Sequence, residues 1–581
     1  MRPLMEKALQ TLLEKNGKIP LVLAPTGYGK TKASIEIEKE AISNGIARGL
    51  VHVVPLRSLV RRIYNDIFKG IPSSGYQMSS SLSDHQKSPY FMRRLVVTTI
   101  DSYLWNMFRV PILEYYNLGR KISSGRYYPV AATILSSVNV LDEAHVYLGE
   151  GSTETATATV LAAVQYLAYT NTPTLIETAT MHPGLINRLY AAIRRARKNR
   201  GGGLVLVVWK CLAQKLSQYL NLNLPVEQVD ENPNSSVHQT WITTIEHKNW
   251  SDDTIKNEIA QFSKDGPVLV VANTVKRAVS IYNDLKSITD TDVVLLHGRL
   301  GDKDRNKAED KVASMREGII VATQVVEVGV DINSIAVYTD PAPLENLVQR
   351  AGRACRRGNS LSYCNENGGK IVIIAGSGQK QDMPYNLSSL NEALRLLTDV
   401  INKGKTCLDW RNPCPRNGVT PYYDLIARSK TSDTLNVRNL TKVLREYLKS
   451  DGRPLALLNY LDIYGICNLY RASIMVPLMT EQGFVLASID WALKGPGRDY
   501  LEKCRGTRIP CLLAIHNGEP CDKKGVPAKK IVEALGSGKC STLAEAIQKD
   551  LSIAAQKCSK GKISYAFKTR VGAYKEGIGL V

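Results

Sequence analysis

Short apolar runs alternate with segments of helical periodicity through most of the chain. In the first 180 residues the runs predict five buried strands, at 19–24, 50–55, 94–100, within 132–145 and at 172–180. Amphipathic segments follow the first two strands, at 32–43 and 57–68. Strands that alternate with helices indicate βαβ units and a parallel sheet with helices on both faces.

A second set of strands follows a polar segment at 226–236, which is typical of a linker. Its runs lie at 238–246, 267–273, 292–297, 318–323, 334–339 and 369–376. From about residue 386 the pattern becomes helical, at 390–403, 441–450 and 542–557, with a terminal strand at 562–568. We therefore expect two tandem α/β domains, 1–225 and 226–385, and a helix-rich C-terminal domain, 386–581.

Composition narrows the class of protein. Apolar residues make up 44% of the 581 residues and charged residues 22%, values that exclude a disordered or fibrous chain. The net charge of +21 predicts a polyanionic partner, nucleic acid before an anionic membrane; a basic surface without a partner is the alternative. No run approaches the roughly 20 apolar residues of a transmembrane helix, and the N-terminal segment contains acids. We expect a cytoplasmic protein without a membrane partner.

Two further features leave alternatives open. Nine of the eleven cysteines lie from Cys364 onward, and no pair has CxxC spacing. We favour reduced, buried thiols, with a metal site or disulfides in the C-terminal part as the alternatives. The basic helical stretch at 182–200 is either a solvated helix face or a contact to phosphates.

The segment 24–31 follows a strand and opens a helix, the context of a phosphate-binding loop. It consists of Ala24, Pro25, Thr26, Gly27, Tyr28, Gly29, Lys30 and Thr31. Small residues let backbone N–H groups face a polyphosphate, and the helix N-terminus adds partial positive charge. We expect Lys30 to reach the β- and γ-phosphates and Thr31 to hold Mg²⁺. An ordinary glycine-containing turn is the alternative.

Two acids and a cluster of arginines complete this chemistry. Asp142 and Glu143 end an apolar run, where Asp142 would bind Mg²⁺ and Glu143 would deprotonate the attacking water; a solvated turn is the alternative. Residues 349–358 carry four arginines. They form either a basic helix on DNA or a pair of arginine fingers, Arg353 and Arg356, for the γ-phosphate. If the segment is helical, these two arginines share one helical face.

These three segments, in this order, resemble the DEAH type of superfamily 2 helicases. Four other segments are similar to motifs of that family, at 55–59, 98–101, 178–180 and 322–331. The resemblance implies two RecA-like domains with ATP and Mg²⁺ between them. It implies catalytic roles for Lys30, Asp142, Glu143, Gln349, Arg353 and Arg356, and ATP contacts from Gly329 and Asp331. It also implies nucleic-acid contacts from Pro55, Arg57, Thr98, Thr99, Asp101, Arg299 and Thr323.

The residues of these motifs, and those of the segments 296–305 and 574–581, most resemble the helicase subunit of type I CRISPR interference. The resemblance implies ATP-driven 3′-to-5′ translocation on the displaced, single-stranded DNA of an R-loop, and recruitment by the Cascade surveillance complex. Two departures matter. The family's N-terminal histidine–aspartate nuclease has no counterpart before residue 24, so we expect a split form whose nuclease is a separate polypeptide. Met5 stands where the family often has an adenine-reading glutamine, which leaves adenine selectivity open.

Two rival interpretations stay open on the sequence. One is a superfamily 2 helicase of DNA repair or RNA metabolism. The other is a nucleic-acid-binding scaffold whose ATP site only switches its conformation, without translocation.

Overall fold

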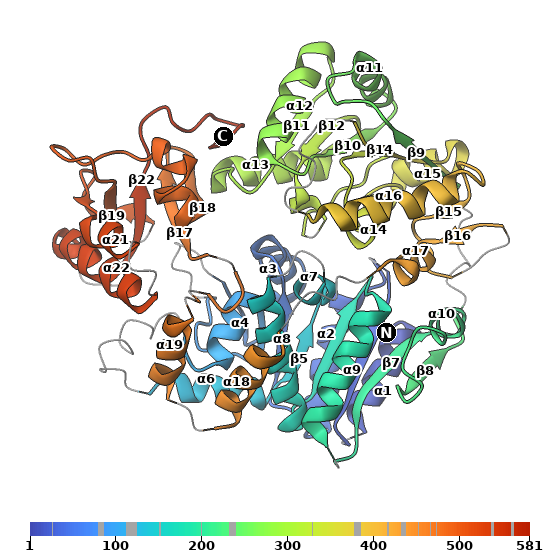
Figure 1. Ribbon diagram of the computed structural model, residues 1–581, viewed down its shortest axis with the longest axis horizontal. Helices are drawn as coiled ribbons and strands as arrows, with labels where there is room; N and C mark the ends of the chain where they lie inside the picture. The colour runs from blue at the N-terminus through green and yellow to red at the C-terminus, as the bar shows by residue number, and fades with distance from the viewer. Residues whose placement is uncertain are drawn as a thin grey trace.

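The structure is a computed structural model of the chain. It describes residues 1–580 except for 15, 26, 79–85, 112–124, 150–152, 199, 232–239, 328, 377–384, 415–417, 431–436, 451–452, 465, 467, 472, 517, 536–539 and 559–562. Within these residues two parallel sheets follow one another along the chain, and a third, mixed sheet lies near the C-terminus (Figure 1). One apolar core runs through the two parallel-sheet domains, and a separate one lies under the third sheet.

The first domain is an eight-stranded parallel sheet. Its strand order is β3 (Ser74–Gln77), β4 (Leu95–Thr99), β2 (Leu50–Val54), β5 (Val138–Leu141), β6 (Thr174–Thr178), β1 (Lys18–Leu23), β7 (Gly203–Trp209) and β8 (Val226–Val229). Its helices are α1 (Pro3–Leu13), α2 (Lys30–Ser43), α3 (Arg57–Ile63), α4 (Ile100–Met107), α6 (Tyr127–Leu135), α7 (His145–Leu148), α8 (Glu154–Tyr169), α9 (Pro183–Arg197) and α10 (Lys210–Leu216). A π-helical turn, Tyr64–Phe68, continues α3.

The register of this sheet places the predicted motifs at one edge. Leu23 at the end of β1 pairs with Thr178 of β6, and Leu141 at the end of β5 pairs with Ile176. The phosphate-binding segment, the acid pair and the segment 178–180 all follow directly. Because parallel strands end on the same side of a sheet, the fold brings these three segments together.

The second domain is a six-stranded parallel sheet. Its strand order is β11 (Val293–Leu296), β12 (Gly318–Ala322), β10 (Pro267–Val271), β13 (Ala336–Thr339), β14 (Gly369–Ile374) and β9 (Trp241–Glu246). Its helices are α11 (Asp253–Phe262), α12 (Val275–Ile288), α13 (Asp302–Ser314), α14 (Leu344–Ala351) and α15 (Gly358–Asn367), with a 3₁₀ turn at Gln324–Val326. Its inner strands are buried like those of the first domain, as a sheet covered by helices requires, and its edge strand β9 is half-buried.

The C-terminal region contacts both domains. Its helices are α16 (Leu387–Ile401), α17 (Tyr422–Arg428), α18 (Arg438–Lys449), α19 (Pro454–Ile463), α20 (Ile489–Leu493), α21 (Lys529–Ala534) and α22 (Cys540–Ala554), with a short strand pair β15 (Leu408–Asp409) and β16 (Thr420–Pro421) and 3₁₀ turns at Pro496–Tyr500 and Ala555–Lys557. Its sheet has the order β18 (Gly483–Ser488), β17 (Met475–Thr480), β22 (Ile563–Lys568), β19 (Cys511–His516) and β20 (Glu519–Pro520), and β21 (Val526–Pro527) pairs with β19. In Figure 1, α18 lies against α8 of the first domain, whereas α16 lies beside the second domain.

The structure confirms the predicted fold class, two α/β domains with parallel sheets and a helix-rich C-terminal region. The strand predicted at 562–568 is β22, and the five strands around it were not predicted. The linker predicted at 226–236 is wrong at its start, because β8 extends the edge of the first sheet. Its short, half-buried pattern explains why periodicity missed it. Within the described residues, no helix is both long and apolar enough to cross a membrane.

The cysteine prediction is also corrected. Reduced thiols were favoured, but the structure pairs Cys211 with Cys414, Cys355 with Cys364, Cys504 with Cys511 and Cys521 with Cys558. Spacing along the sequence cannot reveal the first of these pairs, since its members are 203 residues apart. Among the described residues, no group of three or more His, Cys, Asp or Glu side chains has the arrangement of a metal site.

Candidate nucleotide site and nucleic-acid interface

The phosphate-binding segment turns from β1 into α2 through two glycines. Gly27 has φ +85° and Gly29 has φ +88°, the left-handed region in which other residues are strained. Apart from each glycine itself and its two chain neighbours, no atom of the described residues lies within 4 Å of the position that a Cβ would take on either glycine. Lys30 is the first residue of α2 and is 6% exposed; its Nζ donates to the carbonyl oxygen of Ala24 at 2.8 Å. The loop therefore has open space above it and a buried cation at its base.

Two threonines, Thr26 and Thr31, belong to the phosphate-binding segment. Thr31 follows Lys30 on α2 and is half-buried, at the helix start where a hydroxyl can face a bound cation. Thr26 lies outside the described residues.

Asp142 follows β5 and is held from two sides. Its Oδ2 lies 3.3 Å from Nε2 of His52, and its Oδ1 accepts a hydrogen bond from the backbone N–H of Glu143 at 2.9 Å. Burial raises the pKa of Asp142, but the hydrogen bond to His52 and the charge of Lys30 outweigh it and hold the pKa below its ordinary value. An ionised carboxylate beside the phosphate loop is the ligand that Mg²⁺ prefers.

The adjacent Glu143 has the opposite shift. Burial, and next in the same direction the charge of Asp142, raise the pKa of Glu143, while Lys30 opposes them. Its backbone has φ +52°, a strained conformation for a glutamate. Two adjacent carboxyls whose environments push their pKa values apart can divide their roles, one binding a cation and the other accepting a proton.

His145 joins the acid pair to the segment 178–180. Its Nδ1 lies 2.8 Å from Oγ1 of Thr178, which donates in turn to the carbonyl oxygen of Thr180 at 2.7 Å. Burial, helped by the charge of Lys30, lowers the pKa of His145 to about 3, so the imidazole is neutral. One hydrogen bond, from His145 to Thr178, therefore connects the acid pair to this segment, and a movement of the acid pair would shift the segment through it.

Two residues of this site were missed by sequence reasoning. His52 lies inside β2, and its Nδ1 is 2.9 Å from Oγ of Ser34 on α2, so it connects Asp142 to the loop's helix. Glu177 lies near the end of β6, is fully buried, and neither of its carboxyl oxygens has a hydrogen-bond partner in the described part of the chain. Burial, and next the charge of Asp142, raise the pKa of Glu177 well above its usual value. An acid within an apolar run was the available signal.

The second domain supplies the arginines from a turn. Arg353 and Arg356 lie between the end of α14 and the start of α15, so this part of the segment is not helical and the two arginines do not share a helical face. Arg353 is 4% exposed, and its Nη1 donates to the carbonyl oxygen of Val330 at 3.2 Å. Its Nε is buried and has no hydrogen-bond partner among the described residues. Gln349, on α14, is buried beside this turn.

The two domains meet at this turn. Burial lowers the pKa of Arg353 to about 9, and Glu143 of the first domain acts against that shift, so the two charges interact across the boundary. A Cβ on Gly329, which has φ +93°, would lie 2.6 Å from Oγ of Ser58 on α3. Asp331 pairs with Arg356 of its own domain at 2.9 Å and with Arg62 of α3 at 3.5 Å. Gly329 and Asp331 thus lie where the domains touch.

A basic cluster lies where the two domains meet the C-terminal region. Arg57 begins α3; its Nε is buried and has no hydrogen-bond partner within the described residues. Burial lowers the pKa of Arg57 to about 10, and the neighbouring cations Arg61, Arg305 and Arg471 act in the same direction, against Asp302. Arg61, Arg305 and Arg471 form ion pairs with Asp302, Glu309 and Asp101, whereas Arg57 forms none among the described residues. A guanidinium without an acidic partner in such a cluster is available to a phosphate.

The other predicted nucleic-acid residues are placed less uniformly. Pro55, Thr98, Thr99 and Thr323 are all buried. Thr99 caps α4 by accepting from the N–H of Ser102 at 3.4 Å. Asp101 receives Arg471 of the C-terminal region in a forked ion pair, with Nε to Oδ1 at 3.0 Å and Nη2 to Oδ2 at 2.9 Å. The guanidinium of Arg299 stacks 4.5 Å from the ring centre of Trp491.

The basic helix predicted at 182–200 is α9, and one of its arginines has a structural role. Arg197 is buried, and its Nη1 donates to the carbonyl oxygen of Ala168 at 3.0 Å and to Oδ1 of Asn171 at 2.9 Å. It ties α9 to the end of α8 and is only 7% exposed to solvent.

Comparison with known proteins agrees with this geometry. Residues 2–187 match the DEAD/DEAH box helicase family, and residues 264–359 match the C-terminal family of the CRISPR-associated nuclease/helicase Cas3. The first part of the chain is therefore similar to DEAD/DEAH box helicases, and the second domain is similar to the C-terminal part of Cas3. The CRISPR-associated helicase Cas3 of Thermoproteus tenax is 24% identical over 69% of this chain and 63% of its own length. A putative Cas3 nuclease/helicase of Methanocaldococcus jannaschii is 24% identical over 67% of this chain and 50% of its own.

Solved structures show the same fold. The crystal structure of T. fusca Cas3 with ADP aligns with a TM-score of 0.58 and 17% identity, over 82% of this chain and 59% of that one. The chain therefore spans about half to two thirds of the length of these relatives and of the solved structure.

Proposed function

We propose that this Cas3-type chain is an ATP-dependent 3′-to-5′ DNA translocase and helicase that acts on the displaced strand in type I CRISPR interference. The observation that carries the proposal is the division of one charged site between two domains. The first domain contributes Lys30, Asp142 and Glu143, and the second contributes Arg353, whose charge acts on Glu143. A triphosphate held there would link the position of one domain to that of the other.

The residues present fit ATP and Mg²⁺. The open space over Gly27 and Gly29, the buried cation of Lys30 and the unpartnered Nε of Arg353 suit a polyphosphate. Mg²⁺ held by Thr31 and Asp142 would neutralise charge on the β- and γ-phosphate oxygens. Glu143 positions and deprotonates water, while Arg353 and Arg356 stabilise the negative charge that develops on the γ-phosphate.

The basic cluster around Arg57 supports a nucleic-acid path along α3, α13 and the C-terminal region. Contacts of this kind read the phosphate backbone and no base sequence, as a translocating motor requires. Affinity for single-stranded DNA should fall steeply with salt, because each phosphate contact releases a counterion. The preference for DNA rests on the resemblance to Cas3, and so do recruitment by Cascade and action in the cytoplasm.

The decisive experiment is strand displacement of a 3′-tailed duplex with DNA or RNA as the loading strand. ATP-dependent unwinding from the DNA tail supports the proposal. Hydrolysis without displacement on either strand would favour a scaffold that ATP switches, and displacement from RNA alone would favour an RNA helicase.

Lys30→Ala should abolish ATP hydrolysis while single-stranded DNA still binds, because the substitution removes the cation at the base of the loop and leaves the basic cluster intact. Turnover by a purified chain is measured with and without DNA, beside the matched surface variant Lys39→Ala on the same helix. Hydrolysis at the wild-type rate would contradict the assignment of the loop.

We also propose that DNA cutting belongs to a separate nuclease. The eight histidines of this chain are dispersed along it, and none is followed by aspartate. Incubation of the purified chain with Mn²⁺, Ni²⁺ or Mg²⁺ should leave single-stranded DNA intact. Metal-dependent cutting that follows the chain through stringent purification would contradict this part of the proposal.

A further inference from the structure

Residues 405–414 and 418–430 make specific contacts with both α/β domains. We call this segment, described at 405–414 and 418–430, the strap. On the second domain, Trp410 is buried and its Nε1 donates to Oγ1 of Thr243 on β9 at 2.9 Å. The N–H of Thr243 donates back to the carbonyl oxygen of Lys405 at 2.9 Å. The first part of the strap is therefore attached to the second sheet.

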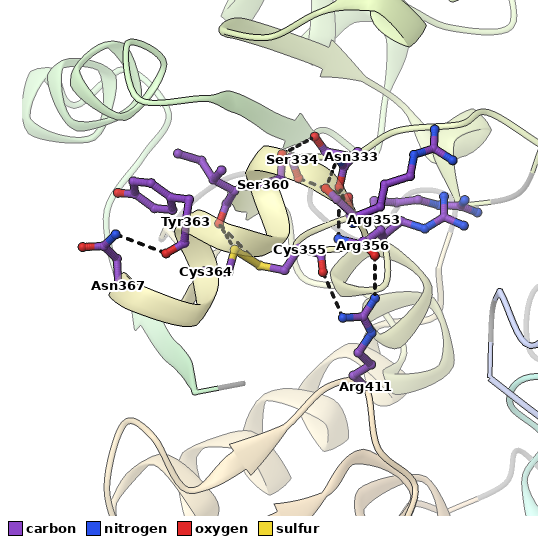
Figure 2. Close-up of a disulfide and its surroundings, with 12 residues drawn as sticks. Asn333, Ser334, Arg353, Cys355, Arg356, Ser360, Tyr363, Cys364, Asn367 and Arg411 are labelled. Atoms are coloured by element: carbon purple, nitrogen blue, oxygen red, sulfur yellow. Dashed lines mark hydrogen bonds between the residues drawn. A yellow bond between two sulfur atoms is a disulfide. The ribbon is translucent and has the colours of Figure 1, made fainter. Parts of the chain in front are cut away.

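The strap next contacts the turn at 352–357 between α14 and α15, which carries Arg353 and Arg356 and which we call the arginine turn. Arg411 spans two neighbouring carbonyl oxygens, with Nη1 2.9 Å from that of Cys355 and Nη2 3.2 Å from that of Arg356 (Figure 2). The first carbonyl belongs to Cys355, two residues after Arg353, and the second belongs to Arg356 itself. Cys355 has φ +56°, a strained conformation for a residue other than glycine. The position of both arginines depends on what holds this turn.

The turn is also held on its other side. The N–H of Cys355 donates to the carbonyl oxygen of Ser334 at 2.7 Å, and the Cys355–Cys364 disulfide ties it to α15 (Figure 2). Both of these contacts lie within the second domain. Arg411 belongs to the strap, so it is the contact through which a segment shared with the first domain reaches the turn.

The later part of the strap holds the first domain at the segment 178–180. Tyr422 donates from its hydroxyl to the carbonyl oxygen of Ala179 at 3.3 Å, and Tyr423 donates to that of Met181. Ala179 is 4% exposed and Met181 is fully buried, so loss of these hydrogen bonds would leave buried carbonyl oxygens without a partner. The Cys211–Cys414 disulfide, with Cα atoms 5.7 Å apart, fixes the strap to α10, and Lys215 pairs with Asp424.

We propose that the strap couples the segment 178–180 of the first domain to the arginine turn of the second, and that Arg411 is a positioning residue for Arg353 and Arg356. The inference rests on the proposed ATPase function. His145 hydrogen-bonds Thr178 beside the acid pair, so the strap closes a path from Glu143 to the arginines that does not pass through the nucleotide. Movement of either end shifts the other through these hydrogen bonds, which are buried at the two tyrosines and partly exposed at Arg411.

The chemistry of Arg411 explains why an arginine stands there. Its planar fork donates to two carbonyl oxygens at once, which a lysine ammonium on a flexible chain cannot do in the same geometry. The substitution Arg411→Lys keeps the charge and loses the fork, so it separates position from electrostatics.

The first test measures DNA-stimulated ATP hydrolysis of the full chain. Arg411→Ala should lower kcat roughly tenfold with the KM for ATP within about twofold of wild type, because a misplaced arginine loses transition-state contacts and few ground-state ones. Arg411→Lys should recover only part of the loss. The matched control is Arg395→Ala, an exposed arginine on α16 whose ion pairs stay on that helix. Thermal midpoints of all three variants should stay close to wild type.

The second test is a double-mutant cycle with Tyr423→Phe, which removes only the hydroxyl. If the strap transmits position, Arg411→Ala combined with Tyr423→Phe should lower kcat little further than the larger single effect. Fold-losses that simply multiply would show independent sites and overturn the coupling. An unchanged kcat in Arg411→Ala would overturn the positioning role. Absence of ATP hydrolysis in the wild-type chain would instead contradict the proposed function, so the two failures are distinguishable.

Discussion

At the scale of single residues, three carboxyls surround one cation. Asp142, Glu143 and Glu177 all lie within the field of Lys30, and only Asp142 has a hydrogen-bonded partner strong enough to lower its pKa. Like charges in a buried site cannot all ionise, so burial assigns different protonation to neighbouring acids. The division of labour between Asp142 and Glu143 follows from His52 and from depth, and not from the residue type, which is nearly the same.

Glu143→Gln should bind ATP but hydrolyse it at least about 100-fold more slowly, because the amide keeps the shape of the side chain and loses the base. Single-turnover hydrolysis and retention of labelled ATP on a filter measure the two properties separately. The control Glu40→Gln, on the exposed face of α2, should behave as wild type. Hydrolysis near the wild-type rate would remove Glu143 from the role of base.

At the scale of elements, one arginine of the predicted finger cluster proves to be structural. Arg350 of α14 is fully buried; its Nε donates to Oε1 of Glu327 at 2.8 Å and its Nη1 to Oγ1 of Thr339 at 2.7 Å. Its Nη2 reaches Oδ1 of Asn273 at 3.0 Å. This network fastens α14 to the ends of β10 and β13, and so sets where the arginine turn begins.

Arg350→Met should destabilise the second domain by about 3 kcal/mol or more, because it leaves the Glu327 carboxylate buried without its cation. Hydrogen exchange of the β10 and β13 amides measures the effect within that domain. Adding Glu327→Leu should restore part of the loss, since both buried charges are then absent. Equal exchange protection in Arg350→Met and wild type would show that the network contributes little.

At the scale of the whole molecule, the C-terminal segment closes onto the second domain. The hydroxyl of Tyr574 donates to Asp304 at 2.8 Å, and the N–H of Gly577 donates to the same carboxylate at 2.7 Å. Nε2 of His297 lies 2.8 Å from the carbonyl oxygen of Ile578, and its Nδ1 accepts from the N–H of Arg299 at 3.1 Å. This docking holds Arg299 and α13 beside the basic cluster.

The docking should weaken as the pH falls from 7.5 to 5.5. Burial lowers the pKa of His297 to about 4 from an ordinary 6.5, with Arg299 and Arg305 acting in the same direction and the hydrogen bond to Ile578 against it. The neutral imidazole is thus favoured in the docked state, so its stabilisation is present above about pH 6.5 and is lost as the pH falls toward 4. Exchange protection of the amides of Gly577 and Leu580 measures the docking.

The matched variant is His297→Gln, whose amide does not titrate and should flatten this dependence. Protection that falls equally in the variant and in wild type would show that another group is responsible.

Much of the fold and of the site could be predicted from the sequence, because each of these features is formed by residues that are neighbours in the chain. Strands β1, β5 and β6 are apolar runs. The loop 24–31, the acid pair and the arginine cluster each occupy one short segment whose chemistry depends on residue type and spacing. Edge strand β8 and most of the C-terminal sheet were missed, since half-buried strands carry a weak pattern.

Only the tertiary structure decided which distant residues act on these segments. His52 and Glu177 are polar residues within apolar strands, and nothing near them in the sequence shows what they contact; they reach Asp142 because parallel strands end together. Arg411 reaches the carbonyl of Cys355 from 56 residues away, and Cys211 reaches Cys414 across 203. The sequence determined the chemical groups, since these depend on residue type. Folding determined their protonation, their partners and the turn that carries the arginines, because burial and contact between remote segments exist only in three dimensions.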